Sequence, residues 1–120
     1  MTPEQQRITI AIAEACEWKE VRISNQREHH LKTYHPIVIG RPNGSISNTE
    51  VVPNYLNDLN AMHEAEKMLT LLQLDEYLNI LYNIVQDPHI CPLTHTIAYV
   101  CATATQRAEA FLRTLNLWTE

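Results

Sequence analysis

The nine residues DPHICPLTH at positions 87–95 hold two histidines and a cysteine, with two prolines among them. Imidazole and thiolate groups bind zinc, so this stretch is a candidate metal site. Its ligands at positions 89, 91 and 95 form no second metal-like pair, and zinc requires four ligands, or three and a water. A remote histidine at position 29, 30 or 35 would have to complete the site. We therefore expect no metal here and interpret the stretch as a turn, because prolines bound such connections.

Other motifs that could do chemistry are incomplete. HEAEK, at 63–67, begins like the HExxH motif of zinc proteases, but Lys67 stands where the second histidine ligand is required. The only glycines are Gly40 and Gly44, which excludes a glycine-rich phosphate loop, and the sequence has no GxSxG, CxxC or DxD motif. No motif argues for an enzyme, and no cofactor is expected.

Two ionisable residues, His63 and Glu66, fall inside the apolar stripe of a helix expected after Pro53. A buried carboxylate must be paired or neutralised, because its desolvation is otherwise strongly unfavourable. Arg107 lies at the edge of the apolar stripe of the last helix and is the expected partner of Glu66. Two interpretations are open: a structural ion pair that locks two helices, or a ligand pocket built from His63, Glu66 and Arg107.

The start of the last helix is a further candidate binding site. Its unpaired N–H groups, the hydroxyls of Thr103 and Thr105, and Arg107 one turn on could hold a phosphate or a carboxylate. The alternative is that the threonines only cap the helix.

Residues 19–50 contain an excess of positive side chains, and we expect target choice to lie there. A local surface for an anionic partner, either a nucleotide or an acidic protein surface, would use Arg22, Arg27, Lys32 and Arg41. The alternative is a solvated hairpin with scattered charge.

The elements that must position these residues follow from hydrophobic periodicity. The first helix begins with Thr2 as cap, Pro3 in the first turn and Gln5 completing a capping box, and is expected to end near Glu17. Apolar residues lie on two of its faces, so the helix is either covered on both sides or contacts a partner, which could be a second copy.

Alternating and apolar runs predict strands at 18–24 and 34–40, paired as a hairpin across residues 25–33, and a third strand at 94–102. Residues 41–45, RPNGS, are typical of a turn. Helices are expected from about Pro53–Asn54, around 74–85, and after a second capping box at 103–106. The order α-β-β-α-α-β-α predicts a single α+β domain over residues 1–120, with a small three-stranded sheet covered by helices.

Composition bounds the function classes. The chain has 120 residues, 45% of them hydrophobic, which suits one folded domain. No apolar run is long enough to span a membrane, no leader is recognisable, and three distant cysteines fit a reducing compartment, so we expect a soluble protein in the host bacterial cytoplasm. The net charge is −5, and residues 51–102 account for all of it, which argues against a general electrostatic grip on DNA.

Three stretches carry a family resemblance: TPEQQRITIAIAEACEW (2–18), PNYLNDLNAMHEAEKML (53–69) and ATQRAEAFLRTLNLW (104–118). Together they resemble the phage ABA sandwich domain, a family of small phage and prophage proteins of largely unknown role. Its most specific parts here are YLNDLNAMHEAEK and QRAEAFLRT, whereas residues 19–50 do not match the family closely. The resemblance implies an α/β/α sandwich and a phage or mobile-element origin, and it brings no catalytic residues.

Small accessory phage proteins without catalytic motifs often act by binding, which is an argument by association. The first hypothesis is therefore a non-catalytic counter-defence binder, which inhibits a bacterial immune protein or sequesters its nucleotide signal. The alternatives are a small enzyme acting on a nucleotide or nucleic acid, and a structural or regulatory phage protein.

Overall fold

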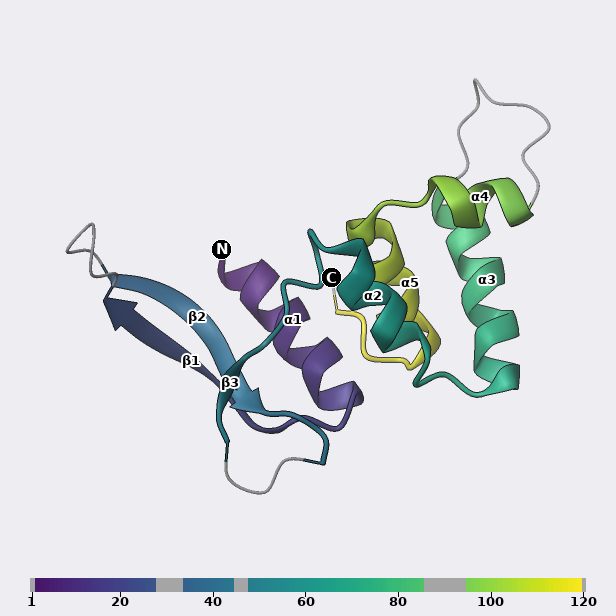
Figure 1. The fold of residues 1–120 in the computed structure, drawn as a ribbon. Coiled ribbons are helices and arrows are strands. Elements are labelled where there is room, and N and C mark those ends of the chain that lie inside the picture. The colour runs from purple at the N-terminus through teal and green to yellow at the C-terminus, as the bar shows by residue number, and fades with distance from the viewer. Residues whose placement is uncertain (1, 28–33, 45–47, 86–94, 120) are drawn as a thin grey trace. The chain divides into compact units, whose positions relative to one another are not determined.

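A computed structural model describes residues 2–27, 34–44, 48–85 and 95–119, with the side chains at 25–27, 34–36, 95 and 96 left out (Figure 1). The elements follow the order α-β-β-β-α-α-α-α. Their bounds are α1 Pro3–Ala15, β1 Lys19–Arg27, β2 Tyr34–Arg41, β3 Glu50–Val51, α2 Leu59–Glu66, α3 Leu71–Val85, α4 His95–Cys101 and α5 Ala104–Thr114. The chain divides into two compact units, Met1–Asn54 and Tyr55–Glu120. The expectation of a single domain stays a prediction.

Helix α1 begins as the sequence predicts. The Thr2 hydroxyl accepts from the Gln5 backbone N–H at 3.1 Å, and the Gln5 side chain accepts from the Thr2 N–H at 2.9 Å. Together they complete the expected capping box. The helix ends at Ala15, two residues before the expected end, because Glu17 has a positive φ of 68°.

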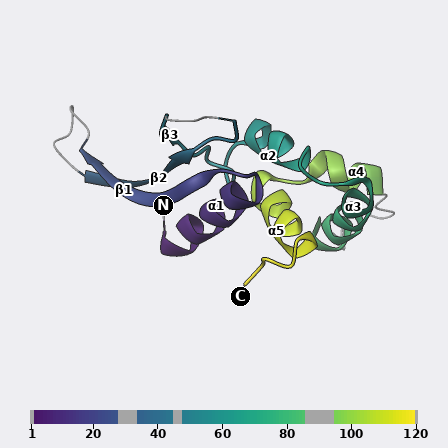
Figure 2. The same cartoon turned by 90° about the horizontal axis from the view of Figure 1, so that it is seen from below.

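The hairpin prediction is confirmed. β1 and β2 pair antiparallel from Lys19↔Arg41 to Arg27↔Tyr34, and β2 carries the buried Val38. In Figure 2, α1 lies along one face of the two strands, and its buried side chains include Ile8 and Ile12. The connection between the strands, at 28–33, lies outside the described residues.

A β-bulge interrupts the hairpin near its open end. Lys19 pairs with Arg41 and Arg22 with Ile39, so β1 holds one residue more than β2 between these pairs. Glu20 has a φ of 54° at this point, which places it in the left-handed region. The chain approaches Gly40 closely here, since a Cβ atom on Gly40 would stand 3.2 Å from the Lys19 carbonyl oxygen.

Replacing Gly40 by alanine is expected to lower the free energy of unfolding by about 1–3 kcal/mol, because the added methyl group crowds backbone and Val21 atoms. Gly44 is the matched control: it has a φ of 87°, and none of the described residues lies within 4 Å of where its Cβ would stand. Gly44→Asn should lower the free energy of unfolding only slightly, because asparagine tolerates positive φ. Gly40→Asn should lower it more than Gly40→Ala does. Urea unfolding of the three variants checks this, and equal effects of asparagine at both positions would contradict it.

The third strand differs from the prediction. β3 pairs with β2 through Ile39↔Val51 and Gly40↔Glu50, which gives the sheet order β1-β2-β3. The strand predicted at 94–102 is wrong, because residues 95–101 form helix α4. Its β-branched residues favour a strand locally, but tertiary packing overrides this preference, and the segment packs against α3 as a helix with Ala98 buried. The α+β class with a small three-stranded sheet is confirmed, and these elements are compatible with a sandwich.

Helix α2 begins later than predicted. Residues 55–57 form a turn, and Asp58 caps the helix by accepting from the backbone N–H groups of Asn60 and Ala61. Tyr55 and Leu56 are nevertheless buried as the stripe predicts. A side chain can therefore enter the core from the turn before a helix.

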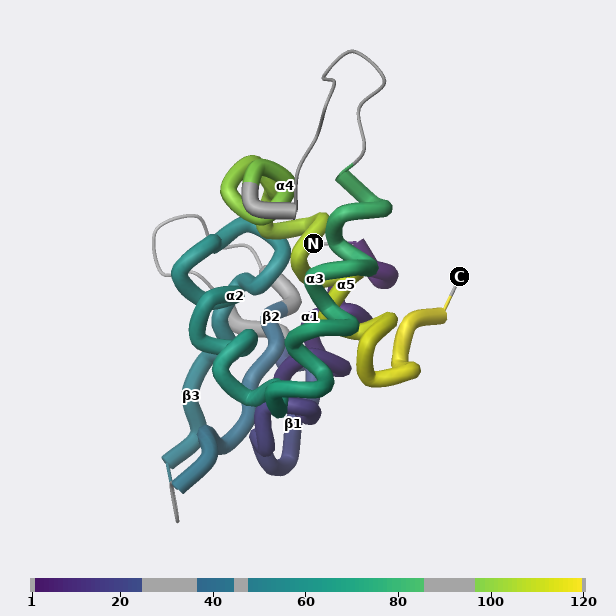
Figure 3. Tube along the Cα trace, turned by 90° about the vertical axis from the view of Figure 1, so that its right-hand side faces the viewer, coloured from purple at the N-terminus to yellow at the C-terminus, as the bar shows by residue number. Residues whose placement is uncertain are grey.

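The second unit, Tyr55–Glu120, is called the helical unit below, and its core lies along α3 and α5. Helix α3 packs against α5 and α4, and Figures 1 and 3 show α4 lying across the end of α3. The prediction of α3 is confirmed, with Tyr77 and Leu81 fully buried in its stripe. Phe111 and Leu112 of α5 are equally buried. Within the described ranges, no helix is long and apolar enough to cross a membrane.

Candidate functional site

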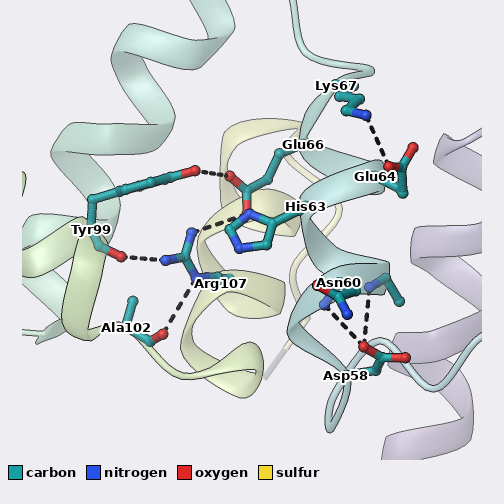
Figure 4. Close-up of polar contacts among 10 residues, drawn as sticks. Asp58, Asn60, His63, Glu64, Glu66, Lys67, Tyr99, Ala102 and Arg107 are labelled. Carbon is teal, nitrogen blue, oxygen red and sulfur yellow. Dashed lines mark hydrogen bonds and ion pairs between the residues drawn. The ribbon is translucent and has the colours of Figure 1, made fainter.

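Glu66 and Arg107 form a buried ion pair in the helical unit. Glu66 is the last residue of α2 and Arg107 lies in the first turns of α5. The Arg107 Nη1 donates to Glu66 Oε1 at 3.1 Å, and the Arg107 side chain is only 3% exposed (Figure 4). The prediction that these two residues lie close together is confirmed.

The pair is completed by helix α4. The Tyr99 hydroxyl donates to Glu66 Oε2 at 3.1 Å, and Arg107 donates to the backbone carbonyl oxygens of Tyr99 and Ala102. The guanidinium carbon also lies 4.3 Å from the centre of the Tyr99 ring, a cation–π contact. Arg107 thus connects α2, α4 and the segment between α4 and α5.

Sequence reasoning missed Tyr99 because it assigned residues 94–102 to a strand. On a helix, Tyr99 lies one turn before the α4–α5 connection, where both its hydroxyl and its carbonyl reach the ion pair. The local pattern gave no signal for a helix, since Ala98 and Ala102, four residues apart, would share one face of either a helix or a strand.

The electrostatics of the cluster keep Arg107 charged. Burial by itself would lower the pKa of Arg107, but attraction to the Glu66 carboxylate and hydrogen bonding at Tyr99 outweigh burial and raise that pKa. The guanidinium is therefore charged at neutral pH. Its five N–H groups suit this role, because the planar fork can serve several acceptors at once.

His63 lies on the open side of the cluster. Its Nδ1 is 3.6 Å from Glu66 Oε1, and its side chain is 42% exposed. The His63 and Tyr99 rings are 6.4 Å apart between centres and tilted by 55° (Figure 4). The sequence-predicted trio His63, Glu66 and Arg107 is therefore brought together, with the histidine as its one half-exposed member.

Tyr77 is wholly buried and lies near the charged groups of the cluster. Its hydroxyl has no hydrogen-bond partner of good geometry among the described residues. Burial raises the pKa of Tyr77 far above its usual range, and the nearby Glu66 carboxylate raises it further, which exceeds the lowering effect of Arg107. The phenol is held neutral.

This pKa shift makes a prediction for alkaline solution. A tyrosine in the unfolded chain ionises near pH 10. Because the pKa of Tyr77 is raised in the folded state, its contribution to stability is full below about pH 10 and is lost as the pH rises further. Near pH 10 the phenolate absorbance of the folded protein should therefore contain no contribution from Tyr77.

The matched variant is Tyr77→Phe, which should leave the phenolate absorbance of the folded protein unchanged. It should also flatten the loss of stability above about pH 10. A smaller native titration amplitude for Tyr77→Phe than for the unchanged protein would show that Tyr77 ionises in place and would contradict the prediction.

The helix-start candidate has its side chains engaged within the unit. The Thr103 hydroxyl accepts from the Gln106 N–H at 3.1 Å in a second capping box, as the sequence predicts. The Thr105 hydroxyl donates to the Leu56 carbonyl oxygen at 2.9 Å, and Arg107 faces Glu66. These contacts hold the helix in place and favour the capping interpretation.

The predicted basic surface is described only in part. Arg22 donates to the Glu20 carbonyl oxygen at 3.1 Å, and Arg41 lies 3.5 Å from the Glu20 carboxylate. Both arginines thus face the β-bulge. The Arg27 side chain and all of Lys32 lie outside the described residues, so an anion surface over 19–50 stays a prediction.

The histidine- and cysteine-bearing stretch at 87–95 lies outside the described residues up to position 94. His95 is the first residue of α4. In the parts of the chain that the structure describes, no group of three or more histidine, cysteine, aspartate or glutamate side chains is placed to hold a metal ion. The expectation of no metal at 87–95 stays a prediction.

Taken chemically, the cluster is a closed set of contacts. Both Glu66 oxygens have hydrogen-bonded partners, and Arg107 serves one carboxylate and two carbonyl oxygens. A general base needs a lone pair free to take a proton, and a ligand pocket needs donors that are not already used. The arrangement therefore suits a structural lock between helices.

No protein-family model matches the chain, and comparison with curated proteins and with solved structures found no significant match. The resemblance to the phage ABA sandwich domain stays a prediction.

Proposed function

We propose that this chain is a non-catalytic binding protein of a phage or prophage, which inhibits a bacterial immune protein by occupying part of its surface. The closed ion-pair cluster supports the non-catalytic part, because its charged groups hold three helices together. The phage setting and the immune target are inferred from the family resemblance.

The observation that carries the binding role is the exposure of two leucines at the start of α3. Leu71 is 86% exposed and Leu72 is 87% exposed. Apolar side chains that lie together on a surface mark sites of contact with another protein, because water is released when they are covered. A lone exposed leucine needs no such explanation, but adjacent ones on a rigid helix favour it.

A plaque assay tests the proposal. The chain is expressed in bacterial strains that each carry one defence system, and the strains are then infected. Plaque numbers should rise with at least one system, and the purified chain should bind a protein of that system at a fixed ratio without consuming nucleotides. An absence of effect on every system, or turnover of a nucleotide, would contradict the proposal.

Sequestration of a nucleotide signal is the second candidate, and one observation favours it. Arg113, Asn116 and Trp118 line a shallow pocket of about 250 Å³. The Arg113 guanidinium lies 5.4 Å from the centre of the Trp118 ring, so a cation and a stacking surface stand side by side. Binding would quench Trp118 fluorescence in a Trp18→Phe background, and unchanged emission over a panel of cyclic nucleotides would exclude it.

A further inference from the structure

The exposed leucines stand at a well-defined place on α3. The Thr70 hydroxyl accepts from the Gln73 N–H at 3.2 Å, and the Gln73 side chain accepts from the Thr70 N–H at 2.9 Å. This capping box holds the first turn of the helix, so Leu71 and Leu72 are presented on a rigid element. Met68, which is 40% exposed, precedes them in the connection from α2.

Acidic residues follow the leucines on the same face. Asp75 lies four residues after Leu71 and Glu76 four residues after Leu72, so each pair meets on one side of the helix. All four side chains are exposed. Neither carboxylate has a hydrogen bond or ion pair with any other residue in the described ranges, and α3 itself contains no lysine, arginine or histidine.

The helical unit carries an excess of negative charge, which favours a positively charged partner. Residues 55–120 hold eight acidic side chains against three lysines and arginines. Each of the three cations already pairs with a carboxylate of the same unit: Lys67 with Glu64 at 2.9 Å, Arg107 with Glu66 at 3.1 Å and Arg113 with Glu109 at 2.9 Å. Asp75 and Glu76 are therefore among the carboxylates for which this unit supplies no lysine or arginine.

A second helical unit would meet this face poorly, because its cations are engaged in the same ion pairs. A nucleic acid would be repelled by it. A basic protein surface would gain both from covering the leucines and from placing lysine or arginine beside the two carboxylates.

We infer a docking surface for a basic protein segment, formed by Met68, Leu71, Leu72, Asp75 and Glu76. This inference rests on the proposed function. The apolar side chains act as anchors at the centre, and the carboxylates set orientation and partner choice. Two leucines cannot make a whole interface, since a stable one covers roughly 800 Å² on each partner. Leu71 and Leu72 are the residues whose replacement should weaken binding most.

The test uses fluorescently labelled amphipathic peptides of about 18 residues, titrated with the whole chain and followed by anisotropy. One peptide has leucine on one helical face and lysine on the other, and its match has glutamate in place of lysine. The lysine peptide should bind at least about tenfold more tightly than the glutamate peptide, and added salt should weaken it.

Three variants separate the contributions. Leu71→Ser with Leu72→Ser should weaken both peptides by about tenfold or more. Asp75→Asn with Glu76→Gln preserves shape, and it should remove most of the preference for lysine and most of the salt dependence. Val100→Ser on α4 is the control, because Val100 is 72% exposed and the described part of α4 has no unpaired carboxylate beside it. This variant should change the peptide affinity by less than about twofold. Thermal melts confirm that each variant is folded.

Equal binding of the two peptides, failure of both to bind, or full binding by either double variant would overturn the inference. So would a wild-type dimer in sedimentation that the leucine variant abolishes, because a second copy would then be the occupant. The plaque assay tests the proposed function independently of the peptides. If the lysine peptide binds selectively but the chain affects no defence system, the proposed function is contradicted and the docking surface for a basic segment still stands.

Discussion

Glu66→Gln and Arg107→Met are each expected to lower the free energy of unfolding by about 3–5 kcal/mol, because each leaves a buried charge without its partner. Glutamine keeps the shape of Glu66, so its effect isolates the charge. Arg107→Met removes the hydrogen bonds to the Tyr99 and Ala102 carbonyl oxygens as well. Urea unfolding of the purified variants measures both losses.

The same helix offers a matched control. Glu64 and Lys67 form an ion pair of 2.9 Å whose side chains are 72% and 70% exposed. Because solvent screens an exposed pair, Glu64→Gln or Lys67→Met should cost less than about 1 kcal/mol. If the buried and exposed pairs gave equal effects, the buried cluster would not be the lock that we describe.

A double replacement distinguishes the charge from the packing. Glu66→Leu combined with Arg107→Met removes both charges and should recover much of the stability lost by either single change, because no unpaired ion is left. The interaction energy from the double-mutant cycle of Glu66→Leu, Arg107→Met and their combination should be large compared with that of the Glu64–Lys67 pair. Additive effects would mean that the two side chains act independently.

Tyr77→Ala is expected to lower the free energy of unfolding by about 3–5 kcal/mol, because the ring is fully buried and its loss leaves a cavity. Tyr77→Phe is the matched variant and should change stability by about 1 kcal/mol or less, since the hydroxyl it removes has no well-formed hydrogen bond in the described structure. Thermal and urea unfolding at neutral pH compare the two.

Tyr99→Phe provides the contrast to Tyr77→Phe. The Tyr99 hydroxyl donates to Glu66 at 3.1 Å, and a hydrogen bond to a charged group contributes about 1.5–3 kcal/mol. Removing it should therefore cost more than removing the Tyr77 hydroxyl. A larger loss for Tyr77→Phe would mean that its hydroxyl has a partner, such as a buried water.

Local sequence by itself determined the ends and faces of several elements. Two capping boxes, Thr2 with Gln5 and Thr103 with Gln106, form as predicted because each uses atoms only three residues apart. The β1–β2 hairpin follows from alternation. The contact of Glu66 with Arg107 was also predictable, since a carboxylate inside an apolar stripe requires a partner of opposite charge and few were available.

Only the tertiary structure decided the character of residues 95–101, the third strand and the partners of the ion pair. Thr, Ile, Tyr and Val favour a strand in isolation, but a helix buries Ala98 and brings the Tyr99 hydroxyl to Glu66. β3 is two residues long, too short for any periodicity, and it exists because β2 offers an edge.

The start of α2 shows the same division between local and tertiary effects. The apolar stripe from Tyr55 onward has helical spacing, yet the cap at Asp58 determines where the helix begins, and Tyr55 is buried from a turn. The exposure of Leu71 and Leu72 was likewise not visible in the sequence, because leucine in a helix is ordinarily assigned to the core. Local hydrogen bonds and hydrophobic patterning act over a few residues, whereas burial depends on which elements pack together, and that is decided by contacts distant in sequence.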